Sequence, residues 1–388
     1  MRILAACSLG GSGHLQPMLP FLDAARREGR ETLVVAPPAL SDMVAVAGYD
    51  FSPGGEPAES LIAPIRERLP IAPPREAAVV ANRDLFAALA TDAMLPSMRA
   101  LVESWRPNLI IRDPSEYASA IVAQEAATPV AQIAIGLAEV EWNSIEIAAS
   151  ALEQRYRGLP AILRASPYAT RFPASLDPSR FPSTQRYDDA VSQTPSLLPD
   201  WWNGSRHPLI YVTFGTVLGH MTIANEVYRA ALDAVSELEA RVLLTVGRRF
   251  DPMSLGVVPG NVHVEQWVDQ NDVFREAAVV VCHGGSGTTF GALRAGLPVV
   301  VVPLFADQHA NGVKVVQSGS GVVVDLHQRQ FGRPPFERSD SPRVADAVRT
   351  VLSDSTYRQH ARVVSDEIVL APTAGEVLRG LVDTAGAP

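Results

Sequence analysis

The chain has 388 residues and a formal net charge of −9, and 47% of its residues are hydrophobic. This length predicts two domains, each with a sizeable core. The acidic balance, with no basic cluster, argues against a general nucleic-acid binder. The longest apolar runs fall well short of the roughly 20 residues that span a bilayer, and the first residues lead straight into an expected strand. We therefore expect a cytoplasmic protein without membrane insertion.

The chain begins with the pattern of a nucleotide-binding α/β unit. A strand over residues 2–7, a glycine-rich loop over 8–14, a helix over 15–28 and a strand over 32–36 follow one another. A dinucleotide-binding fold would place an acidic residue after the second strand, whereas this strand ends in Pro37-Pro38. The sequence therefore disfavours NAD binding in this half.

The rest of the first half alternates between loop and helix patterns. Residues 53–75 are rich in proline and lack a clear period, which predicts a mobile or variable loop. Residues 76–105 are mostly helical in pattern, with a break expected at Pro96. The elements expected next are a strand over 108–112, a helix over 115–127, a strand over 130–135 and mixed helices over 138–165.

A change of composition between residues 166 and 208 predicts the domain boundary, with the interdomain linker near 183–206. This gives an N-terminal domain over 1–200 and a C-terminal domain over 207–388, with the option that the last helix packs back on the first domain. A ligand would lie in the cleft between two such parallel-sheet domains, beyond the C-terminal strand ends. The second half should hold strands over 209–214, 241–246, 279–282, 299–302 and 321–325, a short extended segment over 262–264, and helices over 222–239 and from about 287.

The strongest candidate site is a glycine turn after a buried strand, His-Gly-Gly-Ser-Gly-Thr over residues 283–288. Glycine lets backbone N–H groups approach a ligand, and the helix that follows adds unpaired N–H groups and the positive end of its dipole. This arrangement binds phosphate in many α/β proteins, although a turn of this kind can also be only a tight connection. His283 adds a donor or a cation at the rim.

Polar or aromatic residues also follow neighbouring strands of the second half. An aromatic ring there could stack on a base, and a carboxylate–amide pair could hold sugar hydroxyls. Structural alternatives exist, since Trp267 could be core, Asp307 a helix N-cap and Thr216 a cap of its own helix. The joint occurrence of these residues is harder to explain by structure alone: Gly215-Thr216, Gly247-Arg248, Trp267 and Asp307-Gln308.

The first half offers a candidate acid–base pair. His14 ends the glycine loop at the start of a helix, where the helix N-terminus disfavours a charged imidazole and leaves the ring free to accept a proton. Asp113 follows a strand that can lie beside the first one, so its carboxylate could hold the other ring nitrogen, as in a His–Asp dyad. The alternatives are a structural histidine and an Asx-Pro turn.

The sequence has no Asp-x-Asp motif and no Cys/His cluster with metal-ligand spacing, so nothing in it requires a divalent metal. Its two cysteines, Cys7 and Cys282, lie in expected buried strands and are predicted to be reduced core residues.

These motifs resemble those of GT-B glycosyltransferases of family 1, specifically the bacterial natural-product (antibiotic) glycosyltransferases that use nucleotide-activated sugars. The resemblance covers nearly the whole chain and implies two Rossmann-like domains. It also implies an inverting, metal-independent transfer with no cofactor besides a dTDP- or UDP-sugar co-substrate, to a small hydrophobic acceptor. The motifs are Gly13-His14-Leu15-Gln16-Pro17, Arg112-Asp113, Phe214-Gly215-Thr216, Gln266-Trp267-Val268, residues 283–288 and Asp307-Gln308-His309-Ala310-Asn311.

The resemblance also implies roles for single residues. His14 would be the general base that deprotonates the acceptor hydroxyl, and Asp113 its partner. The loops around 53–90 and 137–165, with Trp142, would hold the acceptor. Trp267 and Val268 match positions that contact the base. The donor diphosphate would lie on His283, Gly285, Ser286, Gly287 and Thr288; Asp307 and Gln308 match positions that hold the sugar, and Ser12, Gly13, Gly215, Thr216 and Arg248 complete the donor set.

This chain departs from many relatives at Trp267-Val268-Asp269-Gln270, where they have Trp-x-Pro-Gln, so the loop shape near the base is open. Two other functions also stay open. A nucleotide-sugar epimerase or hydrolase of the same fold would turn over without acceptor, and an inactive binding paralogue would not need both His14 and Asp113. The sequence does not identify the sugar, the acceptor or the glycosylated atom, and we expect a monomer or homodimer.

Overall fold

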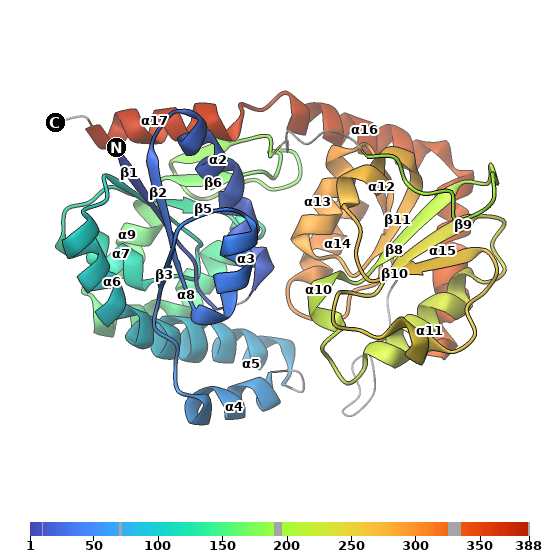
Figure 1. Ribbon diagram of the computed structural model, residues 1–388, viewed down its shortest axis with the longest axis horizontal. Helices are drawn as coiled ribbons and strands as arrows, with labels where there is room; N and C mark the ends of the chain where they lie inside the picture. Colours follow the sequence, from blue (N-terminus) through green and yellow to red (C-terminus); the bar gives the residue numbers. More distant parts are fainter. Residues whose placement is uncertain (10, 70–71, 190–195, 325–334, 387–388) are drawn as a thin grey trace. The chain divides into compact units, whose positions relative to one another are not determined.

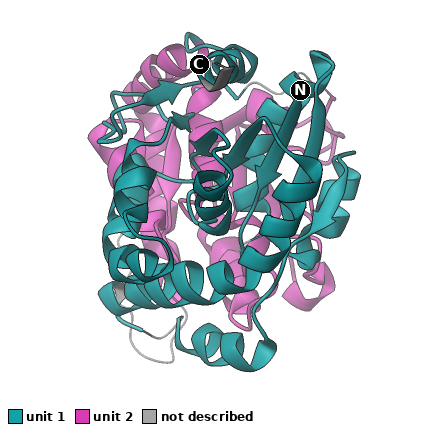
Figure 2. Ribbon diagram, turned by 90° about the vertical axis from the view of Figure 1, so that its left-hand side faces the viewer, with its two compact units in different colours: residues 1–191, 370–388 teal, residues 192–369 magenta. Residues whose placement is uncertain are grey.

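The computed structural model describes residues 1–9, 11–69, 72–189, 196–324 and 335–386. The chain forms two compact units, Met1–Val191 with Leu370–Pro388 and Ser192–Val369 (Figures 1 and 2). The boundary at 191/192 lies inside the span predicted as linker. The C-terminal segment belongs to the first unit, which corresponds to the option that the last helix packs back on the first domain rather than to the plain division at 207–388.

Among the described residues, the first unit contains a seven-stranded sheet with the order β3-β2-β1-β4-β5-β6-β7, in which all neighbouring strands are parallel. The central strands are buried runs of Val, Ile, Leu and Ala, which is typical of a parallel sheet covered by helices on both faces. Its strands are β1 (Arg2–Ala6), β2 (Glu31–Ala36), β3 (Phe51–Pro53), β4 (Leu109–Arg112), β5 (Val130–Ile133), β6 (Tyr168–Thr170) and β7 (Thr184–Arg186).

Helices connect these strands. The helix at the C-terminus, α17 (Ala374–Gly386), packs on α2 and places Val377 and Leu378 in one apolar cluster with Phe21 and Leu22. This packing explains why the end of the chain belongs to the first unit. The other helical segments are α1 (Ser12–Leu15), η1 (Gln16–Met18), α2 (Leu19–Arg27), η2 (Pro38–Leu40), α3 (Ser41–Val46), α4 (Glu59–Arg68), α5 (Pro74–Val79), the π-helix η3 (Val80–Ala90), α6 (Thr91–Trp105), α7 (Ala118–Glu125), α8 (Ala138–Arg155) and α9 (Leu159–Ala165).

Two predictions for this unit are wrong. The loop expected over 53–75 contains α4, a mostly exposed helix whose apolar face buries no residue completely, so it has little periodic signal. The break expected at Pro96 is absent, because α6 continues through it while Met94, Met98 and Val102 anchor the helix in the core. Tertiary packing thus outweighs the cost of one proline in a helix.

The helical stretch Arg75–Trp105 is long and apolar enough, by length and composition alone, to cross a membrane. The sequence lacks a long uninterrupted apolar run here because Arg83, Asp84 and Asp92 divide it. The buried face of this stretch packs in the core of the first unit, as the core helix of a globular domain does.

The second unit contains, among its described residues, a six-stranded parallel sheet with the order β10-β9-β8-β11-β12-β13 (Figure 1). Its strands are β8 (Leu209–Thr213), β9 (Arg241–Thr245), β10 (Val262–Glu265), β11 (Ala277–Cys282), β12 (Val299–Val301) and β13 (Gly321–Val323). Its helical segments are α10 (Gly215–Leu218), α11 (Ala224–Val235), η4 (Pro252–Leu255), α12 (Gln270–Glu276), α13 (Ser286–Arg294), α14 (Gln308–Gln317), η5 (Arg338–Asp340), α15 (Ser341–Ser353) and α16 (Ser355–Val369).

All strands predicted for the second half are present within one or two residues. The strand expected over 321–325 ends at Val323, and Asp325 lies outside the described residues. Cys7 and Cys282 are free and buried in the cores, as predicted. The α/β class with two parallel sheets is therefore confirmed, and in each sheet the C-terminal strand ends share one edge.

Candidate active site

One group of candidate residues lies at the C-terminal edge of the first sheet. Strands β1 and β4 are neighbours, and Ala6 is paired with Arg112, so the two segments that follow these strands start side by side. The segment after β1 carries His14 in the short helix α1, and Asp113 comes directly after β4. The predicted adjacency of these two strands is confirmed.

Asp113 is completely buried and well supplied with hydrogen bonds. Its Oδ2 accepts from the N–H of Ser8 at 2.6 Å, and its Oδ1 accepts from the N–H of Ser115 at 2.7 Å. Burial alone would raise the pKa of this carboxyl group, but His14, the Ser8 N–H and the charge of Arg112 outweigh burial and hold the pKa below its usual value. The carboxylate is therefore ionised near neutral pH.

The imidazole of His14 lies against this carboxylate. Its Nδ1 is 3.3 Å from Oδ1 of Asp113, and 14% of the His14 side chain is exposed. No residue that the structure describes makes a hydrogen bond of good geometry with this Nδ1. Bonds of this kind often tighten only when substrates bind. The arrangement leaves Nε2 as the ring atom for a substrate proton.

A buried guanidinium group that the sequence analysis did not single out supports the Asp113 segment. Arg112 donates to the carbonyl groups of Glu116 at 2.6 Å and Pro114 at 2.9 Å, and to Oε1 of Gln132 at 2.9 Å. These three contacts hold the turn that carries Asp113. The motif Arg112-Asp113 was visible in the sequence, but the groups that accept hydrogen bonds from Arg112 are known only from the structure.

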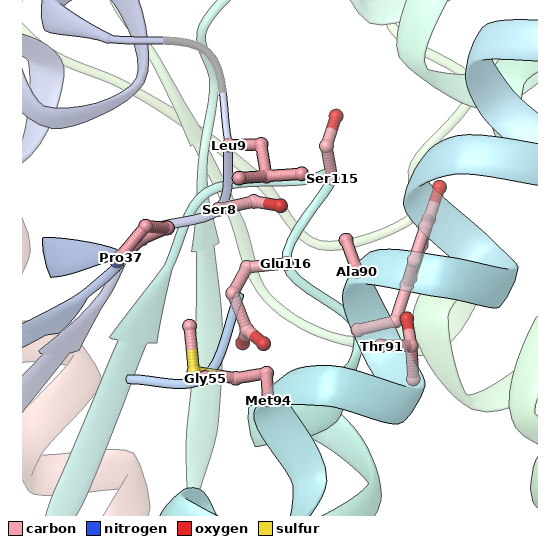
Figure 3. Close-up of a pocket in the computed structure, with 10 residues that line it drawn as sticks. Ser8, Leu9, Pro37, Gly55, Ala90, Thr91, Met94, Ser115 and Glu116 are labelled. Atoms are coloured by element: carbon pink, nitrogen blue, oxygen red, sulfur yellow. The ribbon is translucent and has the colours of Figure 1, made fainter. Parts of the chain in front are cut away.

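A small cavity of about 10 Å³ lies beside this turn (Figure 3). Ser115 and Glu116 face it from the Asp113 segment, while Ala90 at the end of the π-helix and Thr91 at the start of α6 face it from the other elements. Its size suits about one water molecule. The cavity is too small for an acceptor.

The remaining residues predicted for the first domain have different surroundings. Ser12 is half-buried and Gly13 is exposed in the helical turn of His14. Trp142 lies on α8 between the guanidinium groups of Arg164 and Arg180, 5.4 Å and 4.7 Å from its ring centre. Among the contacts of the described residues, none joins Trp142 to His14 or Asp113, so its acceptor role stays a prediction.

A second group of candidate residues lies at the C-terminal edge of the second sheet. Gly285 is the N-cap of α13, and the exposed Gly287 stands in the first turn of this helix. A Cβ atom at position 287 would meet nothing that the structure describes within 4 Å. The first turn of α13 therefore offers N–H groups to an anion in open space.

His283 stands between two glycines. A Cβ atom at Gly215, whose φ is +75°, would lie 2.8 Å from Cε1 of His283, and one at Gly285 would lie 2.7 Å from the same atom. A side chain at either position would therefore displace this ring. Burial lowers the pKa of His283 to about 4, so near neutral pH the ring is neutral and can act as a donor but not as a cation.

Two side chains that the sequence analysis did not select hold this turn in place. Asn311 donates to the carbonyl of Gly284 at 2.8 Å and to Oγ of Ser286 at 3.1 Å. Gln270 exchanges hydrogen bonds with Oγ1 of Thr288 at 3.2 Å and 3.3 Å. The turn is therefore fixed from α14 on one side and from α12 on the other.

Trp267 is half-exposed, at 50%, which excludes the core alternative. The guanidinium of Arg248 lies 4.3 Å from the centre of the Trp267 ring. Two residues that are predicted to bind the nucleotide-sugar donor, from neighbouring strand ends, therefore meet here. Val268 follows in the same loop. Asp269, the departure from the usual motif, caps α12 by accepting from the N–H of Asn271 at 2.9 Å, so the loop leads directly into a helix.

The other residues predicted to bind the nucleotide-sugar donor lie at the starts of helices. Thr216 lies in α10, whose N-cap is Phe214, so it does not cap this helix. Asp307 occupies the N-cap position of α14 without capping it through its side chain. Gln308 is buried, and its Oε1 accepts from the N–H groups of Leu304 and Phe305 at 2.7 Å and 2.9 Å. Its carbonyl thus stabilises the turn, and its role toward a sugar stays a prediction.

No group of three or more His, Cys, Asp or Glu side chains suited to a metal ion occurs among the described residues.

Comparisons with known proteins show the family to which this chain belongs. Residues 23–208 match the N-terminal domain, and residues 229–384 the C-terminal domain, of the erythromycin biosynthesis protein CIII-like family. L-demethylnoviosyl transferase of Streptomyces niveus is 29% identical over 387 residues, which cover 98% of this chain and 97% of that protein. Elloramycin glycosyltransferase ElmGT of Streptomyces olivaceus is 29% identical over 416 residues, which cover 100% of this chain and 98% of that protein.

The solved structure of spinosyn rhamnosyltransferase SpnG superimposes with a TM-score of 0.81 at 23% identity, over 99% of this chain and 100% of that one. This likeness shows a shared fold, the GT-B arrangement of two parallel-sheet domains that the sequence motifs implied. The chain therefore belongs to the erythromycin biosynthesis protein CIII-like family of GT-B natural-product glycosyltransferases.

Proposed function

We propose that this protein is an inverting, metal-independent glycosyltransferase that moves a sugar from a dTDP-sugar to a hydroxyl group of a small hydrophobic natural product. The observation that carries the proposal is the contact of His14 with the buried, ionised Asp113 at a strand edge. A histidine held by a carboxylate in this way is suited to remove a proton from a hydroxyl group.

The choice of donor rests on the second sheet edge and on relatives. The first turn of α13, with neutral His283 beside it, offers donors for a diphosphate without a metal. Arg248 and Trp267 form a stacked pair that suits a nucleobase. SpnG has been solved with thymidine diphosphate and with the spinosyn aglycone. These structures support a thymidine nucleotide and an aglycone acceptor for this chain.

The proposed reaction is a single displacement. Nε2 of His14 takes the proton of the acceptor hydroxyl while its oxygen attacks the anomeric carbon of the sugar. The bond from that carbon to the diphosphate oxygen breaks, and its electron pair leaves with dTDP. Attack opposite to the leaving group inverts the anomeric centre. Asp113 stabilises the imidazolium that forms, and donors around α13 stabilise the charge on dTDP.

The test is a transfer assay with dTDP-glucose and dTDP-rhamnose, each with a panel of hydroxylated aromatic and macrolactone acceptors, read by mass spectrometry. We expect an acceptor product heavier by one sugar residue, with the inverted configuration by NMR. UDP-glucose serves as the comparison donor. Release of dTDP at the same rate without acceptor would indicate a hydrolase, and conversion of the donor into an isomer without acceptor an epimerase. Absence of turnover despite dTDP binding would indicate an inactive paralogue.

A further inference from the structure

The segment η3 (Val80–Ala90) is a feature of the first unit that the proposed reaction does not yet use. Its backbone forms a π-helix of 11 residues between two α-helices, whereas π-helical turns are rare and usually single. The side chain of Thr91 supports these wide turns, because its Oγ1 donates to the carbonyl of Phe86, five residues earlier, at 2.8 Å. Wide turns of this kind are frequent at functional sites.

Phe86 is the residue of this segment that reaches the candidate base. The ring centres of Phe86 and His14 are 5.8 Å apart and their planes differ by 29°, so the two rings are stacked. Phe86 also packs on the apolar cluster that contains Tyr117 and Ile121. The phenyl ring therefore lies between the imidazole and the core of the domain, where its own movement is restricted.

His14 needs a second support because the contact with Asp113 does not by itself fix its ring. The 3.3 Å separation from Nδ1 to Oδ1 lacks good hydrogen-bond geometry. Rotation about the bond between Cβ and the ring is broad for histidine. A face contact with a phenyl ring restricts the plane of the imidazole, and within that plane the Asp113 carboxylate favours the orientation with Nδ1 toward it and Nε2 outward.

The π-helix also packs against the segment that carries Asp113. Ala90 at its end and Thr91, the next residue, line the small cavity together with Ser115 and Glu116 (Figure 3). The segment is thus held next to both members of the dyad. Because a π turn holds more residues than an α turn, the same sequence wound as an α-helix would turn residue 86 in another direction.

We propose that Phe86 is a positioning residue for the general base, and that the π-helix presents it to His14. The inference rests on the proposed role of His14. Phe86 sets the orientation of the imidazole, so that the acceptor proton meets Nε2 while Nδ1 stays on Asp113.

The test compares Phe86→Leu, which keeps an apolar side chain but removes the aromatic face, with Phe86→Tyr, which keeps the ring. We expect kcat to fall about 10- to 100-fold in Phe86→Leu, because a misplaced catalytic group costs this much, and to stay within about threefold in Phe86→Tyr. Phe51→Leu is the matched control, since Phe51 is a half-buried phenylalanine of the same unit in a different cluster. Its kcat should not change, and melting temperatures of all variants report any general loss of stability.

A second readout does not depend on activity. Nitrogen-15 NMR of the imidazole, assigned with His14→Ala, should show one tautomer with the proton on Nδ1 in the wild type and a mixture in Phe86→Leu. An unchanged kcat in Phe86→Leu, or a reduced kcat with an unchanged His14 spectrum, overturns the proposal. If the wild-type protein transfers no sugar, the proposed function fails, and the spectrum alone decides whether Phe86 positions His14.

Discussion

Replacing Gly285 with alanine tests whether His283 binds the diphosphate of the donor, because the added Cβ atom would displace the His283 ring. The backbone of Gly285, with φ −64° and ψ 139°, accommodates alanine, so the substitution adds no backbone strain. The new Cβ, however, would lie 2.7 Å from Cε1 of His283 and closer still to Nε2, where real Cβ atoms keep more than 3.0 Å. The imidazole must therefore move by about 1 Å to restore normal van der Waals contact.

The cost follows from the hydrogen bond that this displacement removes. A hydrogen bond to a charged group contributes about 1.5–3 kcal/mol, so loss of the bond from His283 to a diphosphate should weaken dTDP binding about 10- to 150-fold. Calorimetry with dTDP, without acceptor or metal, measures this. Gly260→Ala is the control, because a Cβ there meets nothing that the structure describes within 4 Å. Wild-type affinity in Gly285→Ala would refute the assignment of His283 to the diphosphate.

Three further predictions concern pH, the dyad and metals. Because the pKa of His283 is about 4 in the folded protein and about 6.5 when unfolded, its contribution to stability is present above pH 6.5 and is lost as pH falls to 4. The free energy of unfolding should fall by up to about 3 kcal/mol over this pH range. In urea unfolding, His283→Asn should not show this fall. An equal fall in both proteins would contradict the prediction. Asp113→Asn should lower kcat about 10²- to 10⁴-fold with unchanged dTDP affinity, and wild-type turnover would exclude the dyad. EDTA should leave transfer unchanged, and a loss that Mg²⁺ restores would contradict metal independence.

The sequence predicted those parts of the site that depend on local pattern. A strand followed by a glycine turn and a helix is specified by neighbouring residues, so the turn after Cys282 and the loop before His14 were found with their elements. Adjacency of β1 and β4 follows from the ordinary order of such folds. These features need no knowledge of distant contacts.

The features that were missed depend on contacts between distant residues. Strands β6 and β7 have three residues each and too little sequence for a period. The contact of the Arg112 guanidinium with Gln132 forms only in the fold, as do the contacts of Gln270 and Asn311 with the glycine turn. The residues of the π-helix show no periodicity that distinguishes it from an α-helix, so the position of Phe86 beside His14 could not be predicted from the sequence.

The central claim is that His14 is the base in an acceptor-dependent sugar transfer. It is tested most directly by comparing wild type and His14→Ala for product formation at dTDP-sugar concentrations that give equal occupancy of the donor site. The account predicts equal dTDP affinity and a transfer rate reduced about 10²- to 10⁴-fold in the variant, since this is the usual contribution of a general base. Equal transfer rates in the two proteins would contradict it.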